Sequence, residues 1–355
     1  LLFFFVVVVT KIIKKNILKK MANILPSESI CMNDIDTLVL CGGGISGISY
    51  VGVFETLFRD LNFDFFSKRR LIKNIIGVSV GAIFGLMVTC GFNHISEMQQ
   101  TLNMLTHTQI MDPDPITFVK YWGADTGQRL RRFLCQLLER KRINPTSTFA
   151  ELQEITHVLF SVCVTNISKH KTEYLSATTT PDFCVVDAIL MSAALPPFFT
   201  PILYRKDRYI DGSILQSIPM CELLHPTKTI IMRIVSERAI KTDTLPNYLT
   251  QIIRVILNNN SRRQITSMSA ELRRRTITVD CNEVTILNFD ICERTNKKLL
   301  LNGIDAAQSF IKTNNIELYN LTRSIGTQTM VNFLTATTVN NAHTSNTQEV
   351  NEAYI

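Results

Sequence analysis

The sequence predicts an α/β fold, and three observations carry that prediction. Two apolar runs that read as buried strands each end in a glycine-bearing turn, and helical spacing of apolar residues follows each turn. The 355 residues are 46% hydrophobic and 19% charged, which is typical of a globular chain and not of a disordered one. This length lies within the range of one large α/β domain with a sizeable core.

The first strand–turn–helix unit begins with a short buried strand at 37–41. The strand runs into the glycine-rich segment GGGISG at 42–47, and helical spacing follows from Ile48 to Phe58. Backbone amides at such a turn and at the start of the helix have no partner within the helix, so they can point at one anionic oxygen.

The second unit contains the pentapeptide GVSVG at 77–81. An apolar strand at 71–79 leads into a helix at 80–90, with Ser79 between Gly77 and Gly81. A sharp turn of this kind lifts the serine hydroxyl into the open, and the two glycines let neighbouring chain pass closely. The same pattern also occurs as a plain strand-to-helix turn, so the pentapeptide alone leaves catalysis open.

The remaining elements follow in chain order. Helices are predicted at 96–106, 126–139, 148–154, 185–193, 245–275 and 296–334, and strands at 157–165, 171–176, 209–211, 229–235, 277–280 and 284–289. Residues 112–115 are predicted to form a loop, because they contain two prolines.

The domain organisation predicted from these patterns is simple. We expect an N-terminal lead-in at 1–34, a catalytic core at 35–240, a mainly helical part of the same domain at 241–334, and a disordered tail at 335–355. The apolar run of nine residues at the start is too short to span a bilayer. We expect Met21 to be the natural start and 1–20 to lie upstream of it, with a membrane-touching arm as the alternative.

Charge and cysteine usage bear on the environment. The net charge is +7, and the Lys and Arg residues are not interleaved with aromatics, so an anionic lipid surface is favoured over nucleic acid as a partner. The basic residues of 126–142 either meet lipid headgroups or form a solvated helix face. Nine cysteines form no CxxC pair, which favours a reduced, intracellular, cytoplasmic location without secretion. Nothing in the sequence predicts an oligomeric state.

An acyl transfer needs a nucleophile, a base and donors for the oxyanion. Ser79 can supply the first, and the amides of Gly43, Gly44 and Ile45 the third. The base is either a histidine or Asp211, which stands in the segment YIDGS. The six histidines are His94, His107, His157, His170, His225 and His343. Their contexts do not favour a triad, with His225 the least unfavourable, so Asp211 is the preferred base in a Ser–Asp dyad.

Taken together, the segments LVLCGGGISGISYVGV, IIGVSVGAIFG, DAILMSAALPPFF and YIDGSILQSIP resemble the patatin-like phospholipase family in the same order along the chain. The resemblance covers about residues 37 to 235. It implies a three-layer α/β/α fold with a central, mostly parallel sheet. It also implies a dyad of Ser79 and Asp211, lipid acyl esters such as phospholipids as substrates, and no metal or organic cofactor.

The same resemblance assigns the oxyanion hole. It puts the donors at Gly42, Gly43 and Gly44, and the free amides of the turn add Ile45. Gly47, Gly77, Gly81 and Gly212 are expected to support these motifs. Two departures concern substrate preference and rate. Ser46 stands where the family usually has Arg or Lys, and Ser213 where Gly is more frequent.

Three other functions remain possible at this stage. Gly42, Gly44 and Gly47 also satisfy the G-x-G-x-x-G pattern of nucleotide-binding domains, with Asp60 or Asp64 near the expected acidic position. A hydrolase that depends on His225 would use the same elbow at Ser79. Ser46 motivates the third possibility, a catalytically weak relative that binds lipid.

Overall fold

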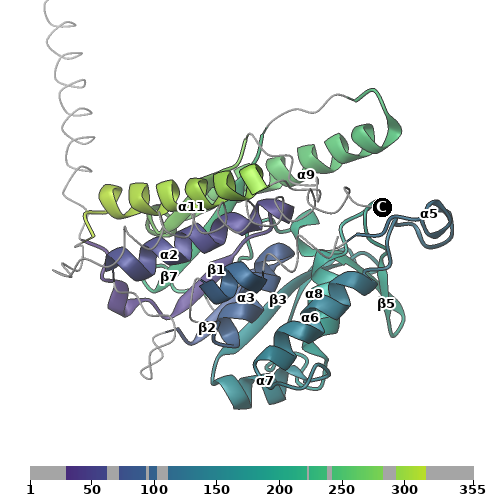
Figure 1. Cartoon of the computed structure of the whole chain (residues 1–355), viewed down its shortest axis with the longest axis horizontal. Coiled ribbons are helices and arrows are strands. Elements are labelled where there is room, and N and C mark those ends of the chain that lie inside the picture. Colours follow the sequence, from purple (N-terminus) through teal and green to yellow (C-terminus); the bar gives the residue numbers. More distant parts are fainter. Residues whose placement is uncertain are drawn as a thin grey trace, which may run out of the picture.

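A computed structural model describes residues 29–61, 72–92, 96–101, 111–221, 224–237, 242–282 and 293–316. These residues build an eight-stranded sheet with helices on both faces (Figure 1). The strands are β1 (Thr37–Leu40), β2 (Asn74–Val78), β3 (Leu159–Asn166), β4 (Lys171–Ser176), β5 (Ile202–Tyr204), β6 (Asp207–Asp211), β7 (Thr229–Val235) and β8 (Thr276–Asp280). Their order is β5-β6-β3-β2-β1-β7-β8, and β4 also pairs with β3.

The helices fall between these strands. They are α2 (Ser49–Leu61), α3 (Val80–Thr89), α5 (Pro115–Tyr121), α6 (Gln128–Arg140), α7 (Phe149–Thr156), α8 (Val185–Ala193), α9 (Leu245–Ser267), α10 (Ala270–Arg274) and α11 (Glu293–Thr313). Short 3₁₀ turns are η1 (Met32–Asp34), η2 (Gly44–Ile48) and η3 (Gly212–Ile214). Among the described helices, none is both long and apolar enough to cross a membrane.

The two faces of the sheet are covered by different helices. Leu38 and Leu40 of β1 belong to the larger core with α2, α3, α8 and α11, whereas Val39 and Ile231 belong to a smaller core with Met268 and α10. Successive side chains of a strand point to opposite faces, so this division follows from the pleat. The result is the three-layer α/β/α fold that the sequence predicts.

The sheet is parallel through its centre and antiparallel at one side. β3, β2, β1, β7 and β8 run parallel, so the carboxyl ends of β1 and β2 meet at the same edge. β6 runs antiparallel to β3, with Asp211 opposite Val164. The neighbouring residue Cys163 pairs with Val78, the last residue of β2. This register places Asp211, the last residue of β6, at the same height in the sheet as Ser79, which follows β2.

Helix α11 lies alongside α2, although the two are far apart in sequence (Figure 1). The helices approach through glycines. A Cβ at Gly52 would lie 2.1 Å from the carbonyl oxygen of Leu300, and one at Gly303 would lie 1.9 Å from that of Ser49. Together with β8, which extends the sheet beside β7, α11 makes the C-terminal part of the chain a component of the same layers.

Several predicted boundaries differ from the structure. Pro115 is the first residue of α5 and not part of a loop, because the N–H it lacks would be unpaired at that position anyway. Asp114 caps this helix. The helix capped by Thr148 continues to Thr156 instead of 154, and His157 ends it with φ of 56° instead of beginning a strand. The helix predicted at 245–275 is interrupted after Ser267.

Other predictions fall wholly or partly outside the described residues. They are the lead-in at 1–28, the strand at 284–289, the end of the helix after 101, the stretch 317–334 and the tail at 335–355. β5 and β6 form a hairpin, of which the sequence predicts only β6. β5 has three residues, which are too few to show an alternating apolar pattern.

Candidate active site

Ser79 occupies a strained turn between β2 and α3. Its backbone has φ of 55° and ψ of −129°, a conformation that L-residues rarely adopt. The flanking glycines make the turn possible, since a Cβ at Gly77 would lie 2.5 Å from Cα of Ala82 and one at Gly81 would lie 2.1 Å from the carbonyl oxygen of Leu40. The turn therefore has the geometry that the GVSVG pattern predicts, and it places Ser79 on the wall of a pocket.

The hydroxyl of Ser192 on α8 holds this turn in place. The Ser79 backbone N–H donates to Ser192 Oγ at 2.8 Å, and Ser192 Oγ donates to the carbonyl oxygen of Cys163 at 2.6 Å. Sequence reasoning missed this residue. It lies inside the segment DAILMSAALPPFF, but one serine in an apolar helix carries no signal of its own that it reaches a turn 113 residues away.

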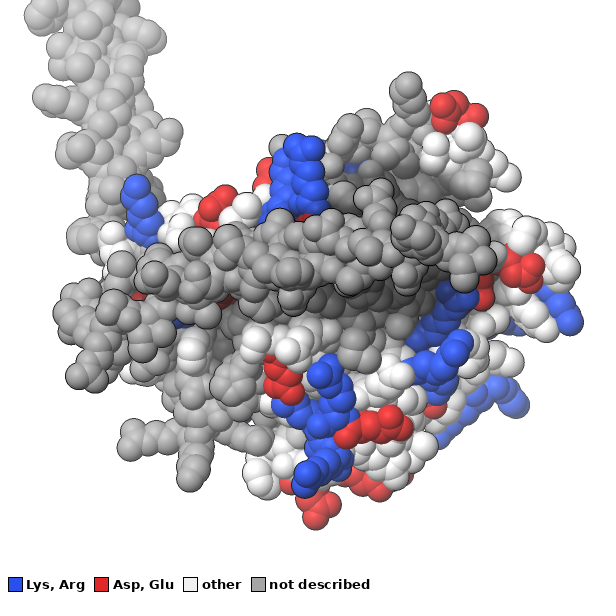
Figure 2. Space-filling model, viewed as in Figure 1, with Lys and Arg blue, Asp and Glu red and all other residues white. Residues whose placement is uncertain are grey.

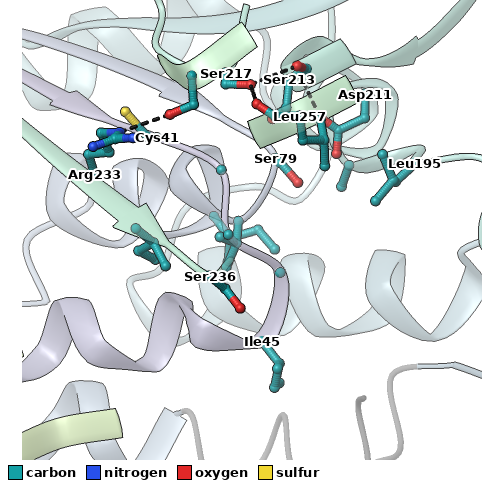
Figure 3. A pocket seen from close by; sticks show the side chains of 18 of the residues that line it. Cys41, Ile45, Ser79, Leu195, Asp211, Ser213, Ser217, Arg233, Ser236 and Leu257 are labelled. Atoms are coloured by element: carbon teal, nitrogen blue, oxygen red, sulfur yellow. Dashed lines mark hydrogen bonds between the residues drawn. The ribbon is translucent and has the colours of Figure 1, made fainter. Parts of the chain in front are cut away.

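Asp211 faces Ser79 from the end of β6. Its side chain is buried, its backbone N–H donates to the carbonyl oxygen of Ala194, and its Oδ1 accepts the backbone N–H of Ser213 at 2.8 Å. Burial raises the pKa of Asp211 to about 6, while interactions with the Ser79 hydroxyl and with Ser213 oppose that rise. Ser79 and Asp211 lie close together in Figure 3, so the structure brings the two residues of the expected dyad into one pocket.

The glycine-rich turn lies next to them. Gly42, Gly43, Gly44 and Ile45 all line the pocket with Ser79. None of the four backbone amides donates a hydrogen bond to another described residue, so they are available to a ligand. Donors of this kind, held on a rigid scaffold, are what a developing oxyanion requires.

A buried tyrosine anchors this turn. The hydroxyl hydrogen of Tyr50, on α2, is shared between the carbonyl oxygens of Cys41 at 2.8 Å and Met232 at 2.9 Å. The contact ties the residue before Gly42 to β7. Tyr50 belongs to the segment LVLCGGGISGISYVGV, but the sequence alone does not indicate this role.

Gly47 and Gly212 stand behind the pocket rather than on its wall. A Cβ at Gly47 would lie 2.5 Å from the side chain of Val80, and one at Gly212 would lie 2.3 Å from the carbonyl oxygen of Cys163. These two glycines allow the glycine-rich turn and the Asp211 turn to pack against the elbow. Their role is therefore one of close packing.

The pocket has a cavity of about 120 Å³ and two chemically distinct parts (Figure 3). Much of its wall is apolar, and Leu195 of this wall lies near Asp211 in Figure 3; the apolar residues are Ile48, Ile83, Phe84, Leu130, Leu195, Phe198 and Phe199. A polar arm on the other side contains Ser217, Arg233 and Ser261, and in Figure 3 Arg233 lies beside Cys41, away from Leu195.

Arg233 is a buried cation in this polar arm. It lies on β7, its side chain is nearly inaccessible from outside, and its Nε donates to Ser261 Oγ at 2.8 Å. Its terminal nitrogens make no hydrogen bond or ion pair with any described residue. Burial lowers the pKa of Arg233, although the nearby Glu237 and Cys41 oppose this. Sequence reasoning missed it, because one Arg in a strand of Ile and Met does not reveal which way it points.

The two departures from the family pattern have different surroundings. Ser46 is fully buried and does not line the pocket, and its Oγ has no hydrogen-bond partner among the described residues. Ser213 lines the pocket, and its Oγ would be 2.4 Å from a Cβ at Gly42. The position of Ser46 therefore supplies no cation in this chain, and Ser213 lies against the glycine-rich turn.

Neither His225 nor Asp60, on which two of the alternative functions depend, lines the pocket. His225 precedes β7 and lies at the opposite edge of the sheet, because Thr229 pairs with Thr37, the first residue of β1. Neither His157 nor His170 lines the pocket, and the other three histidines fall outside the described residues. Asp60 ends α2 and pairs with Arg59 at 2.7 Å, and Asp64 is also outside the described part.

The basic face of α6 is largely engaged within the protein. Arg129 pairs with Asp112 at 2.8 Å, Arg131 pairs with Asp187, and Lys141 pairs with Glu97 at 2.7 Å. Figure 2 shows basic and acidic side chains interspersed over α6 and α7. The paired, solvated interpretation of this face is therefore the better one.

The cysteines form no disulfide in the described part of the chain. The eight cysteines of the described part are free thiols, and Cys292 lies outside it. Within the same residues, no cluster of three or more His, Cys, Asp or Glu side chains is arranged to hold a metal ion.

Comparison with known proteins places this site in a family. A protein of Acanthamoeba polyphaga mimivirus, described as uncharacterized, is 24% identical over 302 residues, which are 82% of this chain and 98% of that protein. A probable lipid hydrolase of Invertebrate iridescent virus 6 is 27% identical over 192 residues, which are 52% of this chain and 61% of that protein.

The fold has a solved counterpart in VipD from Legionella pneumophila. The TM-score is 0.58 at 18% identity, over 79% of this chain and 67% of VipD. A model of the patatin-like phospholipase family matches residues 38–224. Because this match covers more than half of the chain and spans every residue of the expected site, the chain belongs to the patatin-like phospholipase family.

Proposed function

We propose that the protein is a lipid acyl hydrolase of the phospholipase A type, with Ser79 as the nucleophile and Asp211 as the general base. Family membership and the viral relative described as a probable lipid hydrolase support hydrolysis of lipids. The observation that carries the finer assignment is the buried carboxylate of Asp211, which interacts with the Ser79 hydroxyl in a pocket lined by four available amides.

In the first half of the reaction, Asp211 takes the proton of Ser79 as Oγ attacks the ester carbonyl. The negative oxygen of the tetrahedral intermediate accepts hydrogen bonds from amides of the turn at 42–45. The intermediate collapses to an acyl-enzyme, and the lysolipid leaves with the proton from Asp211. In the second half, Asp211 takes a proton from water as the water oxygen attacks the acyl-enzyme. When this intermediate collapses, the fatty acid leaves and Asp211 returns the proton to Ser79 Oγ, which restores the free enzyme.

The two parts of the pocket fit the two ends of a phospholipid. The apolar side, with Phe84, Leu195 and Phe199, can hold an acyl chain. Arg233, in the polar arm, presents terminal nitrogens that have no described partner, and a guanidinium binds phosphate oxygens well. Arg233 therefore supports a phosphate-bearing lipid over a neutral one, and it stands in for the cation that Ser46 does not provide.

Contact with a membrane surface and a reduced, intracellular location belong to the same proposal. The substrate is part of a bilayer, so the protein must meet that surface to reach an ester bond. The free thiols of the described part are consistent with a reducing compartment. No cofactor is needed for the steps above, since each is assigned to a side chain or backbone group of this chain.

Two assays on one set of variants test the proposal. A fluorophosphonate should label wild-type protein on the peptide that contains Ser79, and Ser79→Ala should abolish both the label and the release of fatty acid from phosphatidylcholine vesicles. Ser168→Ala, which changes a serine of the β3–β4 turn outside the pocket, is the matched control and should retain both. Labelling that persists in Ser79→Ala would refute the assigned nucleophile.

A second comparison addresses the headgroup. Arg233→Gln should lower turnover of a phospholipid more than tenfold relative to a diacylglycerol with the same chains, while Arg132→Gln, which changes an exposed residue of α6 outside the pocket lining, should not change that ratio. An unchanged ratio in Arg233→Gln would remove the phosphate assignment and leave the dyad untouched. If wild-type protein binds vesicles but releases no fatty acid, the protein is a lipid-binding relative instead.

A further inference from the structure

Helix α5 exposes apolar side chains that the fold does not cover. None of its residues is buried. Ile116 is 74% exposed and Val119 is 79% exposed, and Trp122, which ends the helix, is 57% exposed. Soluble surfaces carry isolated apolar residues, but several on one seven-residue helix form a patch that indicates an interaction site.

Cations accompany the aromatic residues of this patch. The guanidinium of Arg208 lies 4.4 Å from the ring centre of Trp122, and the Lys120 ammonium lies 5.1 Å from that of Tyr121. The same residues line a shallow hollow with Thr126. A Trp and a Tyr with an apolar body, a polar tip and a neighbouring cation are the side chains that settle at the boundary between lipid headgroups and acyl chains.

The α5 patch is joined directly to the wall of the candidate active site. The backbone N–H of Ala124 donates to the carbonyl oxygen of Pro197 at 2.9 Å, and that of Asp125 donates to the carbonyl oxygen of Phe198 at 2.9 Å. Phe198 is part of the pocket lining. The residues that follow α5 are therefore hydrogen-bonded to the segment that forms part of the pocket wall.

The first half of α9 presents a similar stripe. Leu245, Tyr248, Ile252 and Val255 are between 40% and 65% exposed, and their spacing puts them on one side of the helix. Further along the same helix, Leu257 lines the pocket. In Figure 1, α5 lies at the right-hand edge of the molecule and α9 runs toward that edge. Exposed apolar side chains thus extend from two walls of the pocket.

We propose that α5, together with the first half of α9, docks the protein on the surface of a lipid bilayer that contains anionic headgroups. The proposal rests on the proposed function for its substrate, because an acyl chain has to leave the bilayer to enter the pocket. Apolar side chains next to the pocket walls would enter the upper part of the bilayer, while Lys120 and Arg208 meet phosphates. This combination of aliphatic, aromatic and cationic side chains favours a bilayer over a second copy of the chain.

The protein carries its own probe for a test, since Trp122 is the one tryptophan in the 355 residues. Ser79→Ala protein, which leaves the lipid intact, is titrated with vesicles of phosphatidylcholine containing one third phosphatidylserine. Binding should shift the Trp122 emission to shorter wavelength, and lipids brominated on the acyl chains should quench it. Vesicles of phosphatidylcholine alone should bind more weakly, because the attraction of the cations is lost.

Two variants and a matched control locate the surface. In the Ser79→Ala background, Ile116→Asp and Val119→Asp should each weaken vesicle binding more than tenfold. Ile155→Asp on α7 changes a residue that is 54% exposed but lies on another part of the molecule, and it should bind like its parent. Circular dichroism of each protein checks that its fold is retained.

The outcomes separate this proposal from the function on which it rests. An emission that vesicles do not change, or equal binding by Ile116→Asp, Val119→Asp and the parent, would overturn the docking surface. An emission shift that depends on protein concentration without lipid would overturn it in favour of self-association. Turnover of a soluble short-chain ester by proteins with native Ser79 reports on the catalytic proposal alone, so either proposal can fail while the other stands.

Discussion

The backbone N–H of Ser79 and the hydroxyl of Ser192 are joined by a hydrogen bond of 2.8 Å. Through the second bond of Ser192, to the carbonyl oxygen of Cys163, three elements meet at one side chain: the turn after β2, helix α8 and strand β3. Asp211 is positioned from the same neighbourhood, since its N–H donates to Ala194, two residues after Ser192. The proposed nucleophile and the proposed base are therefore positioned by the same part of the fold.

Removal of this support should affect the rate more than substrate affinity. We expect Ser192→Ala to lower kcat about tenfold or more with a small change in KM, because the turn at Ser79 loses a restraint. The variant also removes a hydrogen-bond partner from the N–H of Ser79 and from the carbonyl oxygen of Cys163, which should lower the unfolding free energy by about 1–3 kcal/mol. Steady-state kinetics and urea unfolding measure both.

A buried hydroxyl elsewhere provides the control for Ser192→Ala. Thr89→Val removes an Oγ1 that donates to the carbonyl oxygen of Gly85 at 2.8 Å at the far end of α3. It should lower stability slightly and leave kcat unchanged. Equal kcat values for the two variants would show that Ser192 contributes only to folding.

The pH dependence of activity should report on Asp211. Burial raises its pKa to about 6, so the carboxylate is ionised above that pH and protonated below it. Only the ionised form can accept the proton of Ser79. We expect kcat/KM to rise with pH to a plateau, with a midpoint near pH 6, when a soluble ester is used so that membrane binding does not contribute. A kcat/KM that does not change with pH between 5 and 7 would argue against the assignment.

The same buried charge should cost the folded protein stability. Because the pKa of Asp211 is higher in the folded state than its usual 3.8, the unfolding free energy falls as pH rises from about 4 to about 6, and the deficit persists above that range. Asp211→Asn removes the charge and keeps an acceptor for the Ser213 N–H. It should abolish turnover and raise the unfolding free energy at neutral pH, on the order of 3 kcal/mol.

Denaturant unfolding at two pH values tests the sign of this effect. The advantage of Asp211→Asn over wild type should shrink toward zero near pH 4, where the wild-type carboxyl is protonated as well. An advantage that stays constant with pH would come from packing and not from the charge.

The contact between Gly42 and Ser213 allows a test by rescue. A Cβ at Gly42 would lie 2.4 Å from Ser213 Oγ but 3.4 Å from Cβ of Ser79, so the clash is with one side chain. We expect Gly42→Ala to displace the oxyanion donors and lower kcat by about 100-fold. The double variant Gly42→Ala with Ser213→Gly should recover part of the loss, because no Oγ remains to collide.

The single variant Ser213→Gly completes the double-mutant cycle. Coupling between the two positions in kcat would confirm the contact, whereas additive losses would mean that Gly42→Ala acts through something other than Ser213.

Most of the elements could be predicted from the sequence because their signals are local. The boundaries of β4, β7 and α8 agree with the segments predicted at 171–176, 229–235 and 185–193. The elbow at Ser79 follows from its two glycines, whose close contacts no other residue allows. A resemblance carried by four short segments then indicated the family, which the match over residues 38–224 confirms.

The features that the sequence does not predict depend on which way a side chain points and on which distant residue it contacts. Arg233 and Met232 are adjacent in one apolar strand, yet one faces the pocket and the other the core, and the pleat alone does not say which. The contact of Ser192 with Ser79 depends on how α8 packs against β2. The sequence does not indicate the exposure of α5, because two closely spaced prolines, at 113 and 115, are more typical of a loop than of a helix start.

The close crossing of α2 and α11 limits how the chain can be shortened. The family match ends at residue 224, and α11 lies beyond it. Even so, α2 and α11 pack with their backbones in close contact, with Gly303 against the carbonyl oxygen of Ser49 and Gly52 against that of Leu300. A protein that ends at residue 224 would lack α11, so the backbone of α2 around Gly52 would lose its packing partner. We therefore expect a shortened protein that still folds to need α11 in addition to the residues that the family model matches.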